Sequence, residues 1–233
     1  MLIVKTGEVI DHPKITGDFE DWILAGTGID PRGAIVRRVD RGEALPEPVS
    51  VSGVIVTGSS AMVSERLDWS EATARWLERA VEAETPVLGI CFGHQLLAHA
   101  FGGVVGPDPS GREIGTVLVR LRAEAVIDPL FASMPALFDA QATHQESVLQ
   151  LPSSAVELAT SRHPANHAFR IGDRAWGVQF HPEFDDGVME SYIEARAGEL
   201  RKEGLDPRWL WAGVRPSPDA VGILELFAEF ISG

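Results

Sequence analysis

The chain has 233 residues, of which 45% are hydrophobic and 23% are charged, a balance typical of a globular protein and not of a long disordered chain. With 20 basic and 34 acidic residues the net charge is −14, which argues against nucleic acid or an anionic membrane as the main partner. Cys91 is the only cysteine, which excludes an intrachain disulfide and a cysteine-rich zinc site. The apolar run at Met1–Lys5 is too short for a signal peptide and no stretch reaches the length of a membrane span, so a cytoplasmic enzyme is expected.

Strands and helices alternate in the first hundred residues. Near-continuous apolar runs predict buried parallel strands at Leu2–Val4, Ala34–Val39, Val51–Val56 and Val87–Ile90. Helices are predicted from Asp68, with Glu71 completing a capping box, and from Phe92 to Phe101. This order predicts an α/β fold with a mostly parallel central sheet and helices on both faces.

The second half of the chain changes character. Residues 114–121 alternate apolar and polar side chains, which is typical of a half-exposed antiparallel strand. Further strands are predicted at 156–160, 168–171 and 176–180, helices at 186–201 and 219–231, and surface loops at 107–111 and 204–218. Trp209 and Trp211 are expected to pack over the core, the alternative being a partner surface. With no repeat and no long linker, residues 1–233 are expected to form a single domain.

The only cysteine lies between a predicted strand and a predicted helix. Gly89-Ile-Cys91-Phe-Gly93 has the pattern of a nucleophile elbow with cysteine in place of serine, a strained turn that needs small residues on both sides. The following helix points its positive end at the sulfur and favours the thiolate. A lone cysteine is most often buried and inert. The flanking glycines and the position after a strand favour a nucleophile at Cys91.

A nucleophile needs a base, and the base needs an orienting group. His181 follows the predicted strand 175–180, and Glu183 comes two residues later. Residues two apart in an extended chain point to the same side, so Glu183 can hold one imidazole nitrogen of His181 and fix its tautomer. His-Pro-Glu alone could be a chance tripeptide, but beside a cysteine elbow it is the favoured partner.

Two motifs together, Gly89–Gln95 followed by Gly102-Gly103 and then Gly177–Glu183, resemble those of class I (triad-type) glutamine amidotransferases, in particular stand-alone members similar to the glutaminase domain of GMP synthases. The similarity runs from about residue 51 to 184, a catalytic core that a helical region at 186–233 follows. It implies a flavodoxin-like fold with a small additional antiparallel sheet. It also implies hydrolysis of glutamine to glutamate and ammonia through a γ-glutamyl thioester on Cys91, with His181 as general acid and base and Glu183 orienting it.

The resemblance also implies an oxyanion hole. Backbone N–H groups of Ser59, in the turn Gly58-Ser59-Ser60, and of Phe92 would stabilise the oxygen of the thioester intermediates. Taken alone, such a turn is more often an ordinary strand end.

Residues for binding glutamine follow in the same way. Gln95 matches a glutamine-binding position, the alternative being a solvated helix residue. Thr143-His144-Gln145 resembles the family loop that cradles the amino-acid end of glutamine, and His144 is given a binding role and not a catalytic one.

Some residues receive no role in chemistry. Arg112-Glu113 also resembles a family segment, but a surface ion pair is the simplest interpretation. The remaining histidines, including His163 and His167, form no recognisable ligand set, so no metal site is predicted. No phosphate-binding G-x-x-x-x-G-K-[ST] loop occurs and no cofactor is expected.

The substrate and partner also follow from the family. Glutamine would be the substrate, and a synthetase or another acceptor enzyme would receive the ammonia. Two alternatives remain open, namely a hydrolase of other γ-glutamyl amide bonds and a non-catalytic regulatory module that keeps the fold.

Overall fold

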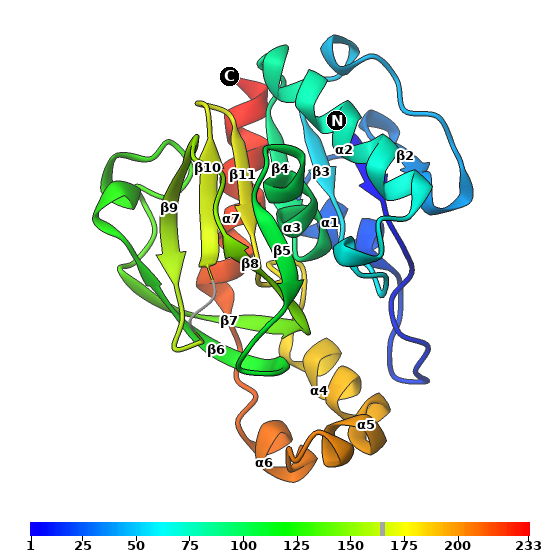
Figure 1. The fold of residues 1–233 in the computed structure, drawn as a ribbon, viewed down its shortest axis with the longest axis vertical. Coiled ribbons are helices and arrows are strands. Elements are labelled where there is room, and N and C mark those ends of the chain that lie inside the picture. Colours follow the sequence, from blue (N-terminus) through cyan, green and yellow to red (C-terminus); the bar gives the residue numbers. More distant parts are fainter. Residues whose placement is uncertain (164–165) are drawn as a thin grey trace.

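The computed structural model describes residues 1–163 and 166–233 (Figure 1). Its strands are β1 (Leu2–Lys5), β2 (Ile35–Arg38), β3 (Val54–Val56), β4 (Val87–Ile90), β5 (Val104–Pro107), β6 (Glu113–Leu121), β7 (Leu137–His144), β8 (Glu146–Gln150), β9 (Ala155–Thr160), β10 (Asn166–Ile171) and β11 (Ala175–Val178). Its α-helices are α1 (Phe19–Thr27), α2 (Asp68–Glu82), α3 (Phe92–Ala100), α4 (Asp186–Ala195), α5 (Ala197–Lys202), α6 (Pro207–Ala212) and α7 (Pro218–Ser232). Among the helices of these residues, none has the length and apolar character that crossing a membrane requires.

A large sheet runs through the molecule in the order β2-β1-β3-β4-β11-β10-β9-β6-β7. The strands from β2 to β11 in this order pair in parallel, and those from β11 to β7 pair antiparallel. A separate antiparallel pair, β5 and β8, forms a small second sheet. The predicted α/β architecture, with its central parallel strands and small antiparallel sheet, is confirmed.

The central strands bury both of their faces. Ile3 and Ile55 pack in one hydrophobic cluster with α1 and α7, whereas Leu2, Val4 and Val56 pack in another with α2 and α3. Figure 1 shows α2 and α3 in front of the sheet and α7 behind it. Burial on both faces explains why these strands are apolar at nearly every position.

Three predictions in the first half were wrong in detail, the first being the strand at Val51–Val56, which begins only at Val54 as β3. β2 lies at the edge of the sheet, where Ile35 is 40% exposed, so this strand is not buried. The residue that precedes α2 is Leu67, and no side chain caps this helix, so the capping box of Asp68 and Glu71 does not form. Asp68 lies in the first turn instead, where its carboxylate interacts favourably with the helix dipole.

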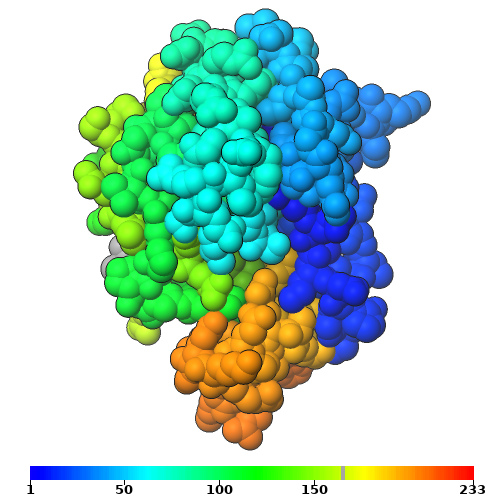
Figure 2. Space-filling view, turned by 45° about the vertical axis from the view of Figure 1, so that its right-hand side comes forward, coloured from blue at the N-terminus to red at the C-terminus, as the bar shows by residue number. Residues whose placement is uncertain are grey.

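The C-terminal region also differs from the prediction. The helix predicted at 186–201 is interrupted at Arg196, between α4 and α5. The predicted loop at 204–218 contains α6, which begins with an Asp206 cap and Pro207 in its first turn. Trp209 is 79% exposed and Trp211 is 45% exposed, so they do not pack over the core as expected. Figure 2 shows this region, in orange, as a lobe at one end of the molecule.

Candidate active site

Cys91 lies at the sharp turn between β4 and α3. Its φ of +50° is a conformation that residues other than glycine rarely adopt. A Cβ added to Gly89 would lie 2.4 Å from the Gly93 carbonyl oxygen, and one added to Gly93 would lie 2.5 Å from the Val56 carbonyl oxygen. The strand, the strained turn, the helix and the need for glycine on both sides all agree with the predicted elbow.

Cys91 and His181 come together because their strands are neighbours. β4 and β11 pair in parallel with Ile90 opposite Val178, and the Cys91 N–H donates to the Val178 carbonyl at 2.9 Å. Parallel neighbours end at the same edge of a sheet, where open α/β sheets commonly form their sites. Cys91 and His181 both line a cavity of about 330 Å³ at this edge.

His181 is held from several sides. β11 ends at Val178, before the predicted strand end, and the His181 N–H donates to the Gln141 carbonyl of β7 at 2.8 Å. The His181 Nδ1–H donates to Glu183 Oε1 at 2.8 Å, and both side chains are buried. The Phe184 ring stacks on the imidazole with centroids 4.1 Å apart.

These contacts affect the charge of His181. Burial opposes protonation, but the charges of Glu183 and Cys91 outweigh it and raise the pKa of His181 to about 10. Its Nε2 is buried and has no hydrogen-bond partner among the residues that the structure describes. His181 lines the same cavity as Cys91. A protonated imidazole in this place can both stabilise a thiolate and give up its Nε2 proton.

Most of the predicted site residues line the cavity. They are Ser59, Cys91, Phe92, Gln95, Thr143, His144, Gln145 and His181. Gly58 and Glu183 lie against His181 instead. A Cβ on Gly58 would come within 2.9 Å of the His181 Cε1 atom, so only glycine permits this close approach.

The side chain of Gln95 is buried and supports the loop at 143–146. Its amide nitrogen donates to the Glu146 carbonyl at 2.6 Å and to Gln179 Oε1 at 3.1 Å. The Thr143 carbonyl in turn accepts a weak hydrogen bond from the Cys91 thiol, with Sγ and the oxygen 3.7 Å apart. Gln95 is therefore not the solvated helix residue of the alternative interpretation.

The Ser59 turn is tied to the end of β1. The Ser59 hydroxyl donates to the Thr6 carbonyl at 2.7 Å and accepts the Ala61 N–H at 3.1 Å. The Thr6 hydroxyl donates to the Gly58 carbonyl at 2.8 Å. These bonds restrict rotation of the turn beside the cavity.

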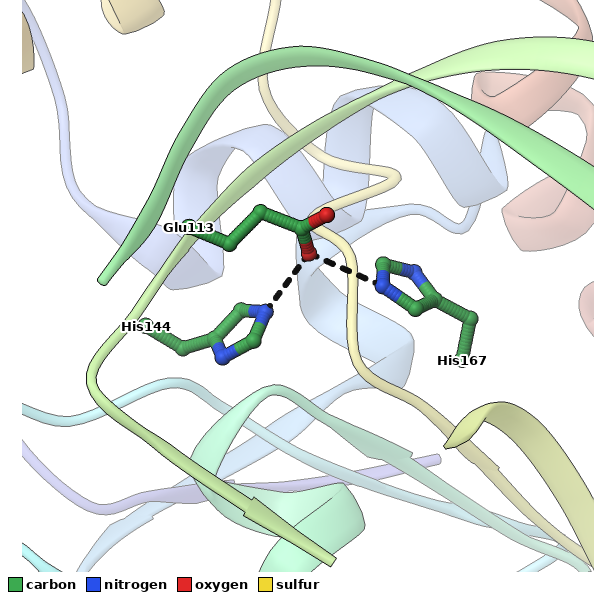
Figure 3. Close-up of side chains that lie close together, drawn as sticks. All are labelled: Glu113, His144 and His167. Atoms are coloured by element: carbon green, nitrogen blue, oxygen red, sulfur yellow. Dashed lines mark hydrogen bonds and ion pairs between the residues drawn. The ribbon is translucent and has the colours of Figure 1, made fainter. Parts of the chain in front are cut away.

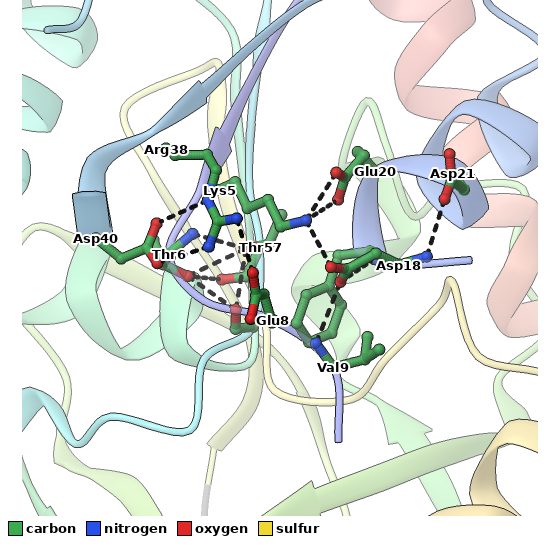
Figure 4. A network of polar contacts seen from close by, with 12 residues as sticks. Lys5, Thr6, Glu8, Val9, Asp18, Glu20, Asp21, Arg38, Asp40 and Thr57 are labelled. Atoms are coloured by element: carbon green, nitrogen blue, oxygen red, sulfur yellow. Dashed lines mark hydrogen bonds and ion pairs between the residues drawn. The ribbon is translucent and has the colours of Figure 1, made fainter. Parts of the chain in front are cut away.

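The segment between β1 and α1 contributes cavity wall that no sequence motif indicated. Val9 and Ile10 line the cavity. Figure 4 shows how Lys5 secures this segment: its ammonium lies 2.6 Å from both Asp18 and Glu20, and Asp18 accepts the Val9 N–H at 3.2 Å. Burial opposes protonation of Lys5, but the two carboxylates outweigh it and raise its pKa.

Arg112 and Glu113 do not form the expected surface ion pair. The Arg112 side chain is only 4% exposed and binds Glu203 at 2.8 Å. Glu113 is also buried, and its carboxylate accepts hydrogen bonds from His144 and His167 (Figure 3). Arg112 lines the cavity itself, and Glu113 contacts the cavity loop through His144.

The profile of the class I glutamine amidotransferase family matches residues 34–197. The chain belongs to this family. The chain is 40% identical over 195 residues to a glutamine-hydrolysing GMP synthase of Thermomicrobium roseum. This alignment covers 78% of the chain and 35% of that protein. The chain is 33% identical over 178 residues to the GMP synthase of Thermosipho africanus, covering 68% of the chain and 33% of that protein. The chain thus spans about a third of the length of these GMP synthases.

Other relatives have different names. The chain is 31% identical over 144 residues to gamma-glutamyl peptidase 4 of Arabidopsis thaliana. This alignment covers 61% of the chain and 57% of that protein. A crystal structure of a glutamine amidotransferase from Thermotoga maritima superposes with a TM-score of 0.76 at 25% identity, covering 99% of this chain and 97% of that one. Nearly the whole fold is therefore shared with a family member.

Proposed function

We propose that this class I family member hydrolyses the side-chain amide of glutamine to glutamate and ammonia through a γ-glutamyl thioester on Cys91. The observation that carries the proposal is the convergence of an elbow cysteine and a buried histidine–glutamate pair on one cavity. The family match and the glutamine-hydrolysing relatives support glutamine as the substrate.

The reaction divides into two steps. The Cys91 thiolate attacks the amide carbon, and the C–N bond breaks as His181 gives its Nε2 proton to the leaving nitrogen, which departs as ammonia. Water then gives a proton to His181 and attacks the thioester, and the C–S bond breaks to release glutamate and the thiolate. Glu183 keeps the other proton on Nδ1, so that Nε2 is the atom that gains and loses a proton.

Both steps pass through a tetrahedral intermediate with a negatively charged oxygen. We assign its stabilisation to the backbone N–H groups of Ser59 and Phe92, both of which line the cavity. Phe92 begins α3, whose dipole adds to this effect. The side-chain bonds of Ser59 support a turn that stays in one conformation, and we expect glutaminase activity in the isolated chain.

The amino-acid end of glutamine is assigned to the other lining residues. Gln95, Thr143, His144 and Gln145 line the cavity, and the buried contacts of Gln95 support the loop at 143–146. Polar groups fixed in this way can distinguish a substrate with free amino and carboxylate groups.

The ammonia is proposed to pass to a separate acceptor enzyme. The relatives are about three times as long as the part matched, and they are named as synthases that hydrolyse glutamine. We propose that residues 1–233 act as one glutaminase domain, with a core at about 51–184, beside a synthetase partner.

The proposal is tested by covalent labelling. A glutamine analogue with an electrophilic side chain is expected to add once to the protein, at Cys91, as read by mass spectrometry. The Cys91→Ala variant is expected to lose both the label and ammonia release. Labelling that persists in this variant would contradict the assignment, and wild-type turnover no faster than that of the variant would favour a subunit that its partner activates.

A second candidate function is hydrolysis of other γ-glutamyl amides. The similarity to a gamma-glutamyl peptidase, 57% of which is covered, favours it. Ammonia release from glutamine is measured beside glutamate release from γ-glutamyl peptides. A kcat/KM that is higher for the peptides would make this candidate the main activity.

A further inference from the structure

Glu113, His144 and His167 form a buried cluster (Figure 3), and His144 also lines the cavity. Glu113 begins β6 and lies directly opposite His144, which ends β7, in the antiparallel register. His167 reaches the same carboxylate from β10, and Glu113 Oε2 lies 2.9 Å from the Nε2 of each imidazole. The side chains are 8%, 1% and 0% exposed in the order Glu113, His144 and His167. Three strands therefore fix one carboxylate.

His144 is bound at both ring nitrogens. Its Nε2 faces Glu113, and its Nδ1 lies 3.0 Å from the Glu146 carbonyl of its own loop. A carboxylate can only accept, so the Nε2–H of His144 donates to Glu113, while its Nδ1 faces the Glu146 carbonyl. Burial lowers the pKa of His144, although the Glu113 carboxylate acts in the opposite direction. The imidazole thus connects β6 to the cavity loop.

The loop is held on its other side by the neighbouring residue. Arg112 binds Glu203, and Glu203 also accepts a hydrogen bond from the Gln145 amide at 3.4 Å. Arg112 and Glu113 therefore support the consecutive loop residues Gln145 and His144. The preceding residue of the loop is the one whose carbonyl contacts the Cys91 thiol. A shift of the loop would consequently move cavity wall relative to the nucleophile.

A metal ion is the competing interpretation, because one atom from each side chain lies within 4.8 Å of the others. The contacts of 2.9 Å between Glu113 and each histidine are those of direct hydrogen bonds. The contact between the His144 Nδ1 and the Glu146 carbonyl would also suit a metal site, since metal-bound histidines donate to carbonyls through their other ring nitrogen. The direct contacts favour a hydrogen-bonded cluster.

We propose that Glu113 and His167 are positioning residues that act through His144 to hold the loop at 143–146 in the shape that receives the amino-acid end of the substrate. This inference rests on the proposed function, but it concerns binding and not bond breaking. It gives a role to the Arg112-Glu113 segment and to a histidine for which the sequence indicated none.

The test compares three variants with a matched surface control. Glu113→Gln keeps the size of the side chain but loses the charge, and is expected to raise KM for glutamine about tenfold or more while kcat changes about twofold or less. His167→Leu removes one donor and is expected to raise KM in the same direction. His167→Gln restores an N–H donor and is expected to return KM toward the wild-type value. Glu225→Gln, on the exposed face of α7, is the control and is expected to leave KM unchanged.

Alkylation of the single cysteine provides a readout that does not need turnover. Iodoacetamide is expected to react with Cys91 at similar rates in all these proteins, whereas protection by glutamine is expected to require about tenfold more glutamine in Glu113→Gln. An altered iodoacetamide rate in both Glu113→Gln and His167→Leu would mean that the nucleophile itself has moved, and would overturn the inference.

Other results would also overturn it. Unchanged KM in both Glu113→Gln and His167→Leu would show that the cluster does not position the loop. Stoichiometric zinc in the purified wild type that is lost in Glu113→Gln would identify a metal site instead. If glutamine protects wild-type Cys91 but is not hydrolysed, the proposed function fails while the variants still measure positioning; if it gives no protection, both fail.

Discussion

Replacing Gly89 by alanine is expected to disrupt the turn that carries Cys91. The added Cβ would lie 2.4 Å from the Gly93 carbonyl oxygen and 2.8 Å from the His94 backbone nitrogen. Since non-bonded heavy atoms sit at about 3.5 Å, the first turn of α3 must move roughly 1 Å away from β4. The atoms in the way belong to the backbone, so no side-chain rotation can relieve the overlap.

The cost can be bounded. Overpacking a well-packed interior costs typically 1–3 kcal/mol, and a clash with helix backbone belongs at the upper end, so we expect a loss of about 3 kcal/mol in the free energy of unfolding. Displacement of a reacting group by about 1 Å lowers activity on the order of a hundredfold. Gly222→Ala, inside α7, is the matched control, because the added Cβ meets no atom within 4 Å other than its chain neighbours and the backbone of its own helix. It is expected to stabilise the protein by about 0.4–1 kcal/mol.

Urea unfolding gives the free energies, and glutamine hydrolysis gives the activity. The two substitutions are chemically identical but should change the free energy of unfolding in opposite directions. A Gly89→Ala protein that unfolds at the wild-type urea concentration and retains wild-type activity would refute the packing argument.

Further predictions concern the proton-transfer groups and the cavity wall. His181→Ala is expected to lower kcat by about 10²–10⁴-fold, and Glu183→Gln by less, because it disturbs orientation and not the group that transfers the proton; equal losses in steady-state assays would contradict this order. With the pKa of His181 raised from 6.5 to about 10, the stability that its protonation contributes is complete below pH 6.5 and is lost as the pH rises toward 10. The kcat/KM profile should fall only around pH 10, where folded His181 itself loses its proton, and Glu183→Gln should move the fall to lower pH. Lys5→Met leaves the carboxylates of Asp18 and Glu20 facing each other and is expected to lower the free energy of unfolding in urea by about 2–3 kcal/mol. This loss is smaller than for a fully buried ion pair, because both carboxylates are partly exposed. An unchanged urea midpoint would show that the ion pairs do not stabilise this segment.

The elbow and the histidine–glutamate pair could be predicted because each is a pattern of neighbouring residues. Gly89, Cys91 and Gly93 are constrained by one turn, and His181 and Glu183 by one extended segment. The cluster of Glu113 with its two histidines could not be predicted in this way. Its members lie on β6, β7 and β10, and only the register of the antiparallel strands brings them together.

The helices also divide into those that the sequence predicted well and those that it did not. The sheet-covering helices α2, α3 and α7 follow the apolar periodicity of the sequence closely. The break at Arg196 escapes that analysis because Ile193 and Leu200, on either side of it, are both buried and are seven residues apart, which continues one helical face across the interruption. α6 is short and starts with proline in a proline-rich segment, so loop signals outweigh its helical pattern.

β11 has a consequence for the order of folding. It is the strand that joins the parallel part of the sheet to the antiparallel part, since it pairs with β4 on one side and with β10 on the other. Cys91 and His181 meet only across this junction, although the whole β5–β10 segment separates their strands in the chain. Closing so long a loop is slow compared with forming local helices. During refolding, reactivity of Cys91 toward a glutamine analogue should therefore return after the helical circular dichroism signal, and it would report when the two parts of the sheet have joined.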